Sequence, residues 1–169
     1  MPKLSAGILL YRRKGQTLEV FLVHPGGPFW KNKDRGSWSI PKGEYEGSED
    51  PLAAARREFE EETGTRVPEG RLQPLGEVRQ PGGKLVSAWA IEGDCAAEEI
   101  RSNLFELEWP PKSGKLQKFP EVDRAGWFDL AEARDKLLPG QHEFLNRLAE
   151  ACGSGLLEFE VSPASKPPA

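Results

Sequence analysis

The sequence predicts a single α+β domain, and three observations support this. Strand-like segments are spread along the chain, one strongly capped helix comes early, and two further helices come near the end. Strands and helices therefore do not alternate regularly, which argues against repeated βαβ units. A length of 169 residues suits one domain, and 37% hydrophobic with 30% charged residues is ordinary for a water-soluble globule. We assign residues 1–161 to this domain and expect the Pro/Ser-rich residues 162–169 to form a disordered tail.

The first elements are expected to form a hairpin followed by a long loop. Residues 4–11 are predicted to be a buried strand, and residues 18–23 its partner. The loop, rich in Pro, Gly and Lys, runs from residue 24 to residue 37 and contains Trp30. Loops of this length inside a compact domain are more often functional than idle.

The early helix has clear sequence signals at both ends. Asp50 is a good N-cap and Pro51 suits the first helical position, while Gly64 is typical of a helix C-terminus. The remaining segments are less sharply bounded. We predict strands at 72–79, 85–92, 100–109 and 122–128, a loop at 110–118, and helices at 130–137 and 141–151.

Three carboxylates of the early helix lie on one face. At 100° per residue, Glu58, Glu61 and Glu62 fall within an arc of about 100°. Like charges at this spacing cost about 0.2–0.5 kcal/mol per pair on an isolated helix. A hard cation such as Mg²⁺ converts that repulsion into binding, because it prefers oxygen ligands. The alternative is a solvated charged face that Arg56 and Arg57 stabilise.

Charge is distributed unevenly along the chain. The net charge is −4, with 23 basic and 27 acidic residues. Residues 43–65 contain eight acidic and two basic residues, so the rest of the chain is slightly positive. An acidic segment inside a mildly basic chain suits divalent cations with an anionic ligand around them. The acidic total gives no footprint for general nucleic-acid binding.

Residues 43–65, GEYEGSEDPLAAARREFEEETGT, resemble the Nudix box. Every position of that pattern is matched except the last, where Thr65 replaces the usual aliphatic residue. Residues 38–43, WSIPKG, resemble the segment that enters the box in Nudix proteins, and residues 119–128 resemble the final strand of the family. The resemblance implies a Nudix-type α/β/α sandwich with a mixed β-sheet and the activity of a pyrophosphohydrolase.

The resemblance also implies roles for individual residues. Arg57 is expected to orient a catalytic glutamate through a charge-assisted hydrogen bond, and Glu49 to pair with that arginine. The implied ligands of Mg²⁺, or Mn²⁺ in its place, are Glu58, Glu61, Glu62 and the main-chain carbonyl of Gly43.

The expected reaction needs a base as well as a cation. Cations that bridge the oxygens of a pyrophosphate lower the barrier to attack by water, and a carboxylate can take the proton from that water. Glu61 is one candidate because Arg57 would hold it in place. Glu121, which precedes the last predicted strand, is the other because many family members supply a base from outside the box.

The substrate is expected to be a nucleotide, namely a nucleoside triphosphate or a dinucleoside polyphosphate. Lys42 would contact phosphate, and Trp30 or Trp38 would stack on a base. Lys112 and Lys115 would grip a longer polyphosphate. The alternative is a catalytically inactive Nudix-fold module that binds a nucleotide or regulates a partner. Such degenerate members usually lose a box glutamate or the arginine, and this chain retains them.

Several other classes of protein are disfavoured. No run of 18 or more apolar residues occurs, so no transmembrane helix is expected, and the N-terminus lacks the pattern of a signal peptide. Two distant cysteines, Cys95 and Cys152, argue against a disulfide framework and a zinc site. A reducing cytoplasm is therefore the expected location. The sequence does not indicate an oligomeric state.

Overall fold

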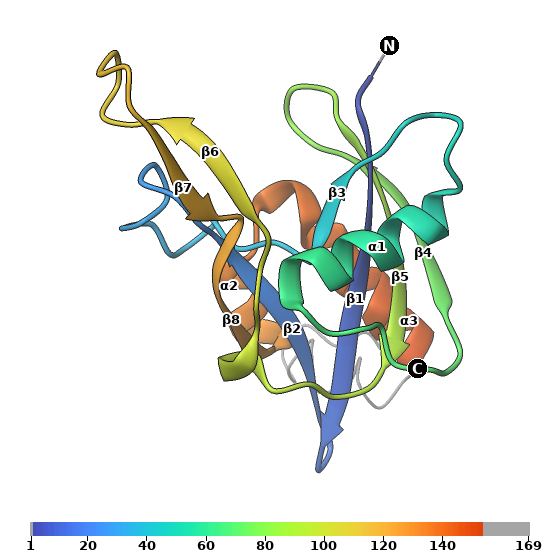
Figure 1. The fold of residues 1–169 in the computed structure, drawn as a ribbon. Helices are drawn as coiled ribbons and strands as arrows, with labels where there is room; N and C mark the ends of the chain where they lie inside the picture. Colours follow the sequence, from blue (N-terminus) through green and yellow to red (C-terminus); the bar gives the residue numbers. More distant parts are fainter. Residues whose placement is uncertain (1, 154–169) are drawn as a thin grey trace.

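The computed structural model describes residues 2–153 and contains eight strands and three α-helices among them (Figure 1). The tail expected at 162–169 and the end of the domain assigned to 1–161 lie outside the described residues, so both stay predictions. The strands are β1 (Leu4–Lys14), β2 (Thr17–Pro25), β3 (Lys42–Glu44), β4 (Gln73–Arg79), β5 (Leu85–Glu92), β6 (Leu104–Glu108), β7 (Leu116–Pro120) and β8 (Val122–Asp129). The helices are α1 (Pro51–Thr63), α2 (Leu130–Lys136) and α3 (His142–Cys152), with short 3-10 turns at Ala97–Glu99 and Pro139–Gln141.

The main sheet is mixed. Its strands lie in the order β4-β5-β1-β2-β8, and β3 pairs with the N-terminal part of β1. β1 runs parallel to β5, whereas the other pairs in this sheet are antiparallel. β6 and β7 form a separate two-stranded sheet that projects from the body of the molecule (Figure 1).

Helices cover both faces of the main sheet. Successive side chains of a strand point to opposite faces, so β1 contributes Ile8 to one cluster of buried residues and Leu9 to the other. Phe59 of α1 packs with Ile8, and Phe144 of α3 packs with Leu9. Burial of one such phenylalanine contributes about 1.5–3 kcal/mol. This arrangement is an α/β/α sandwich, and the predicted fold class is confirmed.

The ends of α1 form as the sequence predicts. The Asp50 side chain accepts a hydrogen bond from the main-chain N–H of Ala53 at 2.9 Å, and Pro51 occupies the first turn. Gly64 adopts a left-handed conformation with φ of 76° and donates its N–H to the carbonyl of Glu60 at 2.7 Å. Both ends are thus held by local contacts.

Two segments differ from the sequence prediction. The sequence predicts no strand at residues 42–44, but β3 forms there and pairs with residues 5–7 of β1. Residues 116–118 were expected in a loop, yet they belong to β7 and pair with β6, so the loop is limited to the turn between these strands. Neither strand carries an alternating apolar pattern strong enough to identify it, and long-range pairing creates both.

Among residues 2–153, no helix is both long enough and apolar enough to cross a bilayer. Cys95 and Cys152 are both free thiols. The cytoplasmic location expected from the sequence stays a prediction.

Candidate active site

The acidic face of α1 turns toward β3. Glu58 and Glu62 are buried in this contact, with 8% and 9% of their surface exposed. Gly43 of β3 lies so close to the Glu58 carboxylate that a Cβ atom at this position would collide with it. The absence of a side chain at residue 43 therefore lets the main chain of β3 meet a carboxylate of α1.

Arg57 connects three of the predicted site residues. Its Nη1 donates to Glu58 Oε2 at 2.7 Å, and its Nε and Nη2 donate to the carboxylate of Glu49 at 3.2 Å. The ion pair with Glu61 is longer, with 3.6 Å between Nη1 and Oε2. The sequence predicts that Arg57 holds Glu61, whereas the shortest contact of Arg57 in the structure is with Glu58.

Burial and mutual repulsion disfavour the charged forms of these carboxylates. Burial, reinforced by Glu58, raises the pKa of Glu62 to about 8, although the charge of Lys42 opposes the shift. Burial and then the charge of Glu61 raise the pKa of Glu58, against the effect of Arg57. Both carboxylates therefore ionise less readily than an exposed glutamate, and a bound cation would favour their charged forms.

Glu121 reaches the same region through a series of main-chain hydrogen bonds. The N–H of Asn103 donates to the Glu61 carbonyl at 2.8 Å, and the N–H of Glu121 donates to the Asn103 carbonyl at 2.8 Å. The Glu121 carbonyl in turn accepts from the N–H of Gly26 at 2.9 Å. Burial first and the charge of Glu61 second raise the pKa of Glu121.

A cavity of about 180 Å³ lies where these elements meet. Its polar wall contains Lys42, Glu62 and Glu121, and Trp30 of the long loop lies on its rim. The rest of the lining is Val23, Pro25, Ser37, Ser39, Val122 and Leu138. Larger hollows of about 580, 480 and 760 Å³ lie elsewhere on the surface, and none of the three is lined by Glu62 or Glu121, although the second is lined by Glu49 and Arg57. Among these hollows, the small cavity is the one lined by both Glu62 and Glu121, together with Lys42 and Trp30.

A comparison with known families agrees with these observations: the spacing of the glutamates on α1, the contact between Glu58 and Gly43, and the surrounding sandwich. The model of the NUDIX domain matches residues 1–148. The chain belongs to the Nudix family. This confirms the family predicted from the sequence, and it supports the enzyme class that goes with the family.

Solved structures share the Nudix fold with this chain. The NUDIX domain of Shewanella oneidensis NrtR, complexed with ADP ribose, has a TM-score of 0.63 and 18% identity, covering 90% of both chains. The C. elegans Ap4A hydrolase has a TM-score of 0.59 and 19% identity, covering 88% of this chain and 97% of that one. The MutT protein of Methanosarcina mazei has a TM-score of 0.57 and 20% identity, covering 90% and 97%. At these identities, the likeness establishes the fold alone.

One curated relative is longer than this chain. An octanoyltransferase of Myxococcus xanthus is 29% identical over 137 residues, which cover 80% of this chain and 33% of that protein. The chain therefore matches about a third of the length of this relative.

Trp38 does not face the cavity of this Nudix domain. It is 4% exposed, and its ring packs edge-on against His24 and Phe128 at centroid distances of 5.2 and 5.1 Å. Its Nε1 donates to Asp34 at 2.7 Å. Trp38 is thus a core residue outside the cavity lining, and this position gives no support to the expectation that it stacks on a base.

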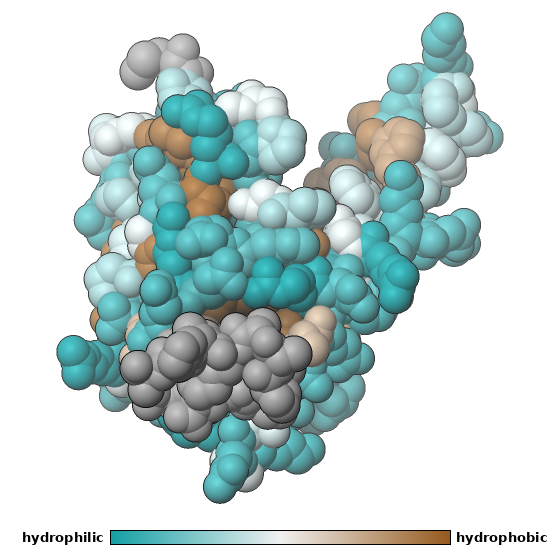
Figure 2. All heavy atoms as spheres, turned by 180° about the vertical axis from the view of Figure 1, so that it is seen from behind, coloured by the Kyte–Doolittle hydropathy of each residue, from teal (hydrophilic) through white to brown (hydrophobic). Residues whose placement is uncertain are grey.

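Lys112 and Lys115 also lie apart from the cavity lining. Both belong to the turn between β6 and β7, and both are exposed. Figure 2 shows this arm standing away from the body, with apolar residues among its hydrophilic ones. Lys42 therefore lines the cavity, whereas Lys112 and Lys115 do not.

The acidic side chains fit a divalent cation in their chemistry, although they are not gathered around a single point. Over residues 2–153, no three carboxylate, imidazole or thiol groups form a ready-made coordination sphere. Glu58 instead contacts Arg57, and Glu62 accepts from the main-chain N–H of Lys42 at 3.3 Å. A hard cation suits this set because it would offset the burial and the mutual repulsion that raise the pKa values of both glutamates.

Sequence reasoning missed two contributors to this site. Asn103 acts through its main chain, so its side chain carries no signal. Lys84 follows the turn before β5, pairs with Glu44 at 3.1 Å, and is second to burial in lowering the pKa of Lys42. Only pairing between distant strands brings Lys84 to Lys42, and no local pattern reveals it.

Proposed function

We propose that this chain hydrolyses a phosphoanhydride bond in a nucleoside diphosphate-linked substrate, with Mg²⁺ or Mn²⁺ as cofactor. A nucleoside triphosphate or a dinucleoside polyphosphate is the proposed substrate. The observation that carries this proposal is the cavity in which Glu62, Glu121 and Lys42 lie beside Trp30. Glu62 and Glu121 supply carboxylates for a metal ion, Lys42 supplies a positive charge for phosphate, and Trp30 supplies an aromatic ring for a nucleobase. A nucleotide substrate requires groups of these three kinds.

The proposed metal ligands are Glu58, Glu61, Glu62 and the carbonyl of Gly43. A divalent cation held there would neutralise phosphate charge and favour ionisation of an attacking water. Arg57 has a positioning role, because its hydrogen bond of 2.7 Å fixes the carboxylate of Glu58 while Glu49 fixes the guanidinium. This arrangement holds one ligand in place before substrate arrives.

We assign the general base to Glu121 in preference to Glu61. Glu121 lines the cavity, whereas Glu61 is absent from the lining and forms an ion pair with Arg57. The raised pKa of Glu121 also suits a base, because proton transfer is most effective when the pKa approaches the working pH. Lys42 and Trp30 are the proposed binding contacts. Lys42 would bind phosphate, and Trp30 would stack on the nucleobase.

The structural relatives support a nucleotide as the substrate. One is described with ADP ribose bound and another as an Ap4A hydrolase, and both compounds carry adenosine on phosphates that are linked by phosphoanhydride bonds. An inactive binding module is less well supported, because Arg57, Glu49 and Glu58 lie in mutual hydrogen-bond contact.

A hydrolysis assay tests the proposal directly. The purified chain is incubated with nucleoside triphosphates, dinucleoside polyphosphates and nucleotide sugars, with Mg²⁺, with Mn²⁺ or with EDTA, and the products are separated. We expect cleavage of at least one nucleotide with either metal and none with EDTA. Nucleotide binding without cleavage of any substrate would identify a binding module instead, and turnover in EDTA would refute the metal requirement.

A further inference from the structure

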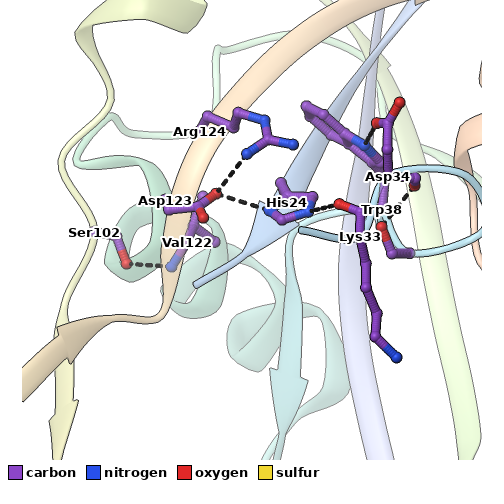
Figure 3. A network of polar contacts seen from close by, with 9 residues as sticks. His24, Lys33, Asp34, Trp38, Ser102, Val122, Asp123 and Arg124 are labelled. Atoms are coloured by element: carbon purple, nitrogen blue, oxygen red, sulfur yellow. Dashed lines mark hydrogen bonds and ion pairs between the residues drawn. The ribbon is translucent and has the colours of Figure 1, made fainter. Parts of the chain in front are cut away.

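His24 links three segments of the chain from a fully buried position at the end of β2 (Figure 3). Its Nδ1 lies 2.8 Å from Oδ1 of Asp123, and its Nε2 lies 2.6 Å from the main-chain carbonyl oxygen of Lys33. The first partner belongs to β8 and the second to the long loop. A single ring therefore spans the gap between that loop and the beginning of β8.

The three segments that His24 joins are also walls of the proposed substrate cavity. Val23 and Pro25 flank His24 and line the cavity, as do Trp30 of the loop and Glu121 next to β8. His24 itself lies behind the wall, with its ring against Trp38. It is therefore placed to set the shape of the cavity without contacting a ligand.

Main-chain hydrogen bonds within the loop connect Lys33 to Trp30. The N–H of Lys33 donates to the Trp30 carbonyl at 3.0 Å, and the N–H of Trp30 donates to the Gly27 carbonyl at 3.3 Å. Residues 27–33 thus form a compact turn. Its first end is held because Gly26 donates to the carbonyl of Glu121, and its other end is held at the Lys33 carbonyl by His24.

We propose that His24 is a positioning residue for substrate binding: it holds the 27–33 turn so that Trp30 faces Glu121 across the cavity. This inference rests on the proposed function of the cavity. Glu121 has its own main-chain link to Asn103, so loss of the His24 contact would displace Trp30 and leave Glu121 in place. The effect should therefore appear in binding and not in the chemical step.

A pair of amide substitutions separates the two bonds of the ring. In His24→Gln the longer side chain reaches the position of Nε2 and can still donate to the Lys33 carbonyl. In His24→Asn the amide reaches only the position of Nδ1, so the contact with Asp123 is kept and the loop is released. His142→Asn is the matched control, because His142 is the other histidine and lies in α3.

The first measurement is independent of catalysis. Trypsin cleaves after Lys31, Lys33 and Arg35, and the Lys33–Asp34 bond contains the carbonyl that His24 contacts. We expect His24→Asn to accelerate cleavage in this loop by about tenfold, because proteolysis follows the population of the open form. His24→Gln and His142→Asn should cleave at the wild-type rate, as mapped by mass spectrometry.

The second measurement is the kinetics of nucleotide hydrolysis at saturating Mg²⁺. We expect His24→Asn to raise KM by about tenfold with little change in kcat, because uniform binding is lost. His24→Gln should keep the wild-type KM. Equal damage from both substitutions, a fall in kcat alone, or wild-type behaviour of His24→Asn would each overturn the inference.

Two further controls keep the outcomes separable. If the His24 variants fail to fold, as judged by thermal unfolding, Asp123→Leu and Asp123→Asn replace them. Asp123→Leu removes the carboxylate that fixes the ring and should release the loop, whereas the asparagine can still accept from Nδ1 and should keep the loop held. If wild-type protein hydrolyses no nucleotide, the proposed function fails. The cleavage rates then still decide whether His24 holds the loop.

Discussion

At the scale of single residues, the candidate site is a set of carboxylates that repel one another. Glu58 and Glu62 are buried on the same face of α1, and Glu121 approaches from the start of β8. The pKa values of all three are raised, in each case by burial first and by neighbouring carboxylates second. Their roles are then separable by substitution, because ligands and base respond differently to the concentration of metal.

The assignment of the base can be tested with Glu121→Gln and Glu61→Gln. Loss of a general base typically costs about a hundredfold or more in rate, and added metal cannot restore it. We expect this behaviour of Glu121→Gln. We expect Glu61→Gln to raise the Mg²⁺ concentration needed for half-maximal activity, because a proposed ligand is lost. Steady-state assays across a Mg²⁺ titration measure both effects, and the reverse pattern would make Glu61 the base.

The raised pKa of Glu62 predicts how stability changes with pH. In metal-free protein, the folded state keeps a proton that the unfolded chain releases near the ordinary glutamate pKa of 4.5. The unfolded state therefore binds fewer protons, so stability falls as pH rises from about 4.5 to about 8 and then levels off. Glu58 and Glu121 act in the same direction.

Thermal unfolding in EDTA and in Mg²⁺ checks this linkage. We expect Mg²⁺ to raise Tm more at about pH 8.5 than at about pH 6, since cations bind the ionised carboxylates. Glu62→Gln should flatten the pH dependence in EDTA. A metal effect that is equal at both pH values would contradict the assignment of Glu62 as a ligand.

At the scale of elements, the short strand β3 positions the site. It pairs with β1 through residues 42–44, and this brings the main chain of Gly43 against Glu58 of α1. The helix supplies carboxylates at fixed spacing, but β3 determines how closely the main chain can approach them. A minimal side chain at residue 43 should therefore disturb the site.

Gly43→Ala tests this contact. We expect kcat/KM to fall by about tenfold or more, because misplacement by about 1 Å can cost a hundredfold in rate. Gly47→Ala is the matched control, since nothing lies within 4 Å of a Cβ added there. The measurement is kcat/KM for both variants, with Tm to confirm folding. Equal activity of the two variants would show that Gly43 does not shape the site.

At the scale of the whole molecule, the sandwich and the β6–β7 arm are distinct parts. The sandwich brings the cavity walls together, whereas the arm joins the main sheet only through its connections and carries Lys112 and Lys115 on its turn. Phe29 of the long loop packs against Trp109 of the arm at a centroid distance of 5.4 Å. The two lysines can therefore act only on a ligand that extends beyond the cavity.

Neutralising Lys112 and Lys115 together tests this division. We expect kcat/KM for a nucleoside triphosphate to stay within about twofold of wild type, because exposed charges are screened over about 10 Å at 0.1 M salt. Any loss should be confined to substrates with four or more phosphates, appear in KM and shrink at high ionic strength. Assays with both substrate lengths at low and high salt provide the measurement. A loss on the triphosphate would place the lysines closer to the reaction than the structure does.

The sequence by itself determined the features that depend on neighbouring residues. The caps of α1 at Asp50 and Gly64, the common face of Glu58, Glu61 and Glu62, and the boundaries of β5 follow from contacts within a few positions. The sandwich was predictable as well, because the Nudix box is a pattern of nearby residues that identifies the family, and the family implies the fold. Helical geometry and capping fix such features before the chain folds.

Only the tertiary structure decided the features that depend on distant residues. The pairing of β3 with β1, the link from Glu61 through Asn103 to Glu121, and the burial of Trp38 join segments that are tens of residues apart. The hydrogen bond from Arg57 to Glu58 also depends on tertiary structure. Gly43 of β3 lies against the Glu58 carboxylate, and this contact limits where the carboxylate can lie. Packing between elements selects one arrangement among several that the local pattern allows equally, and that selection determines which residues reach the cavity.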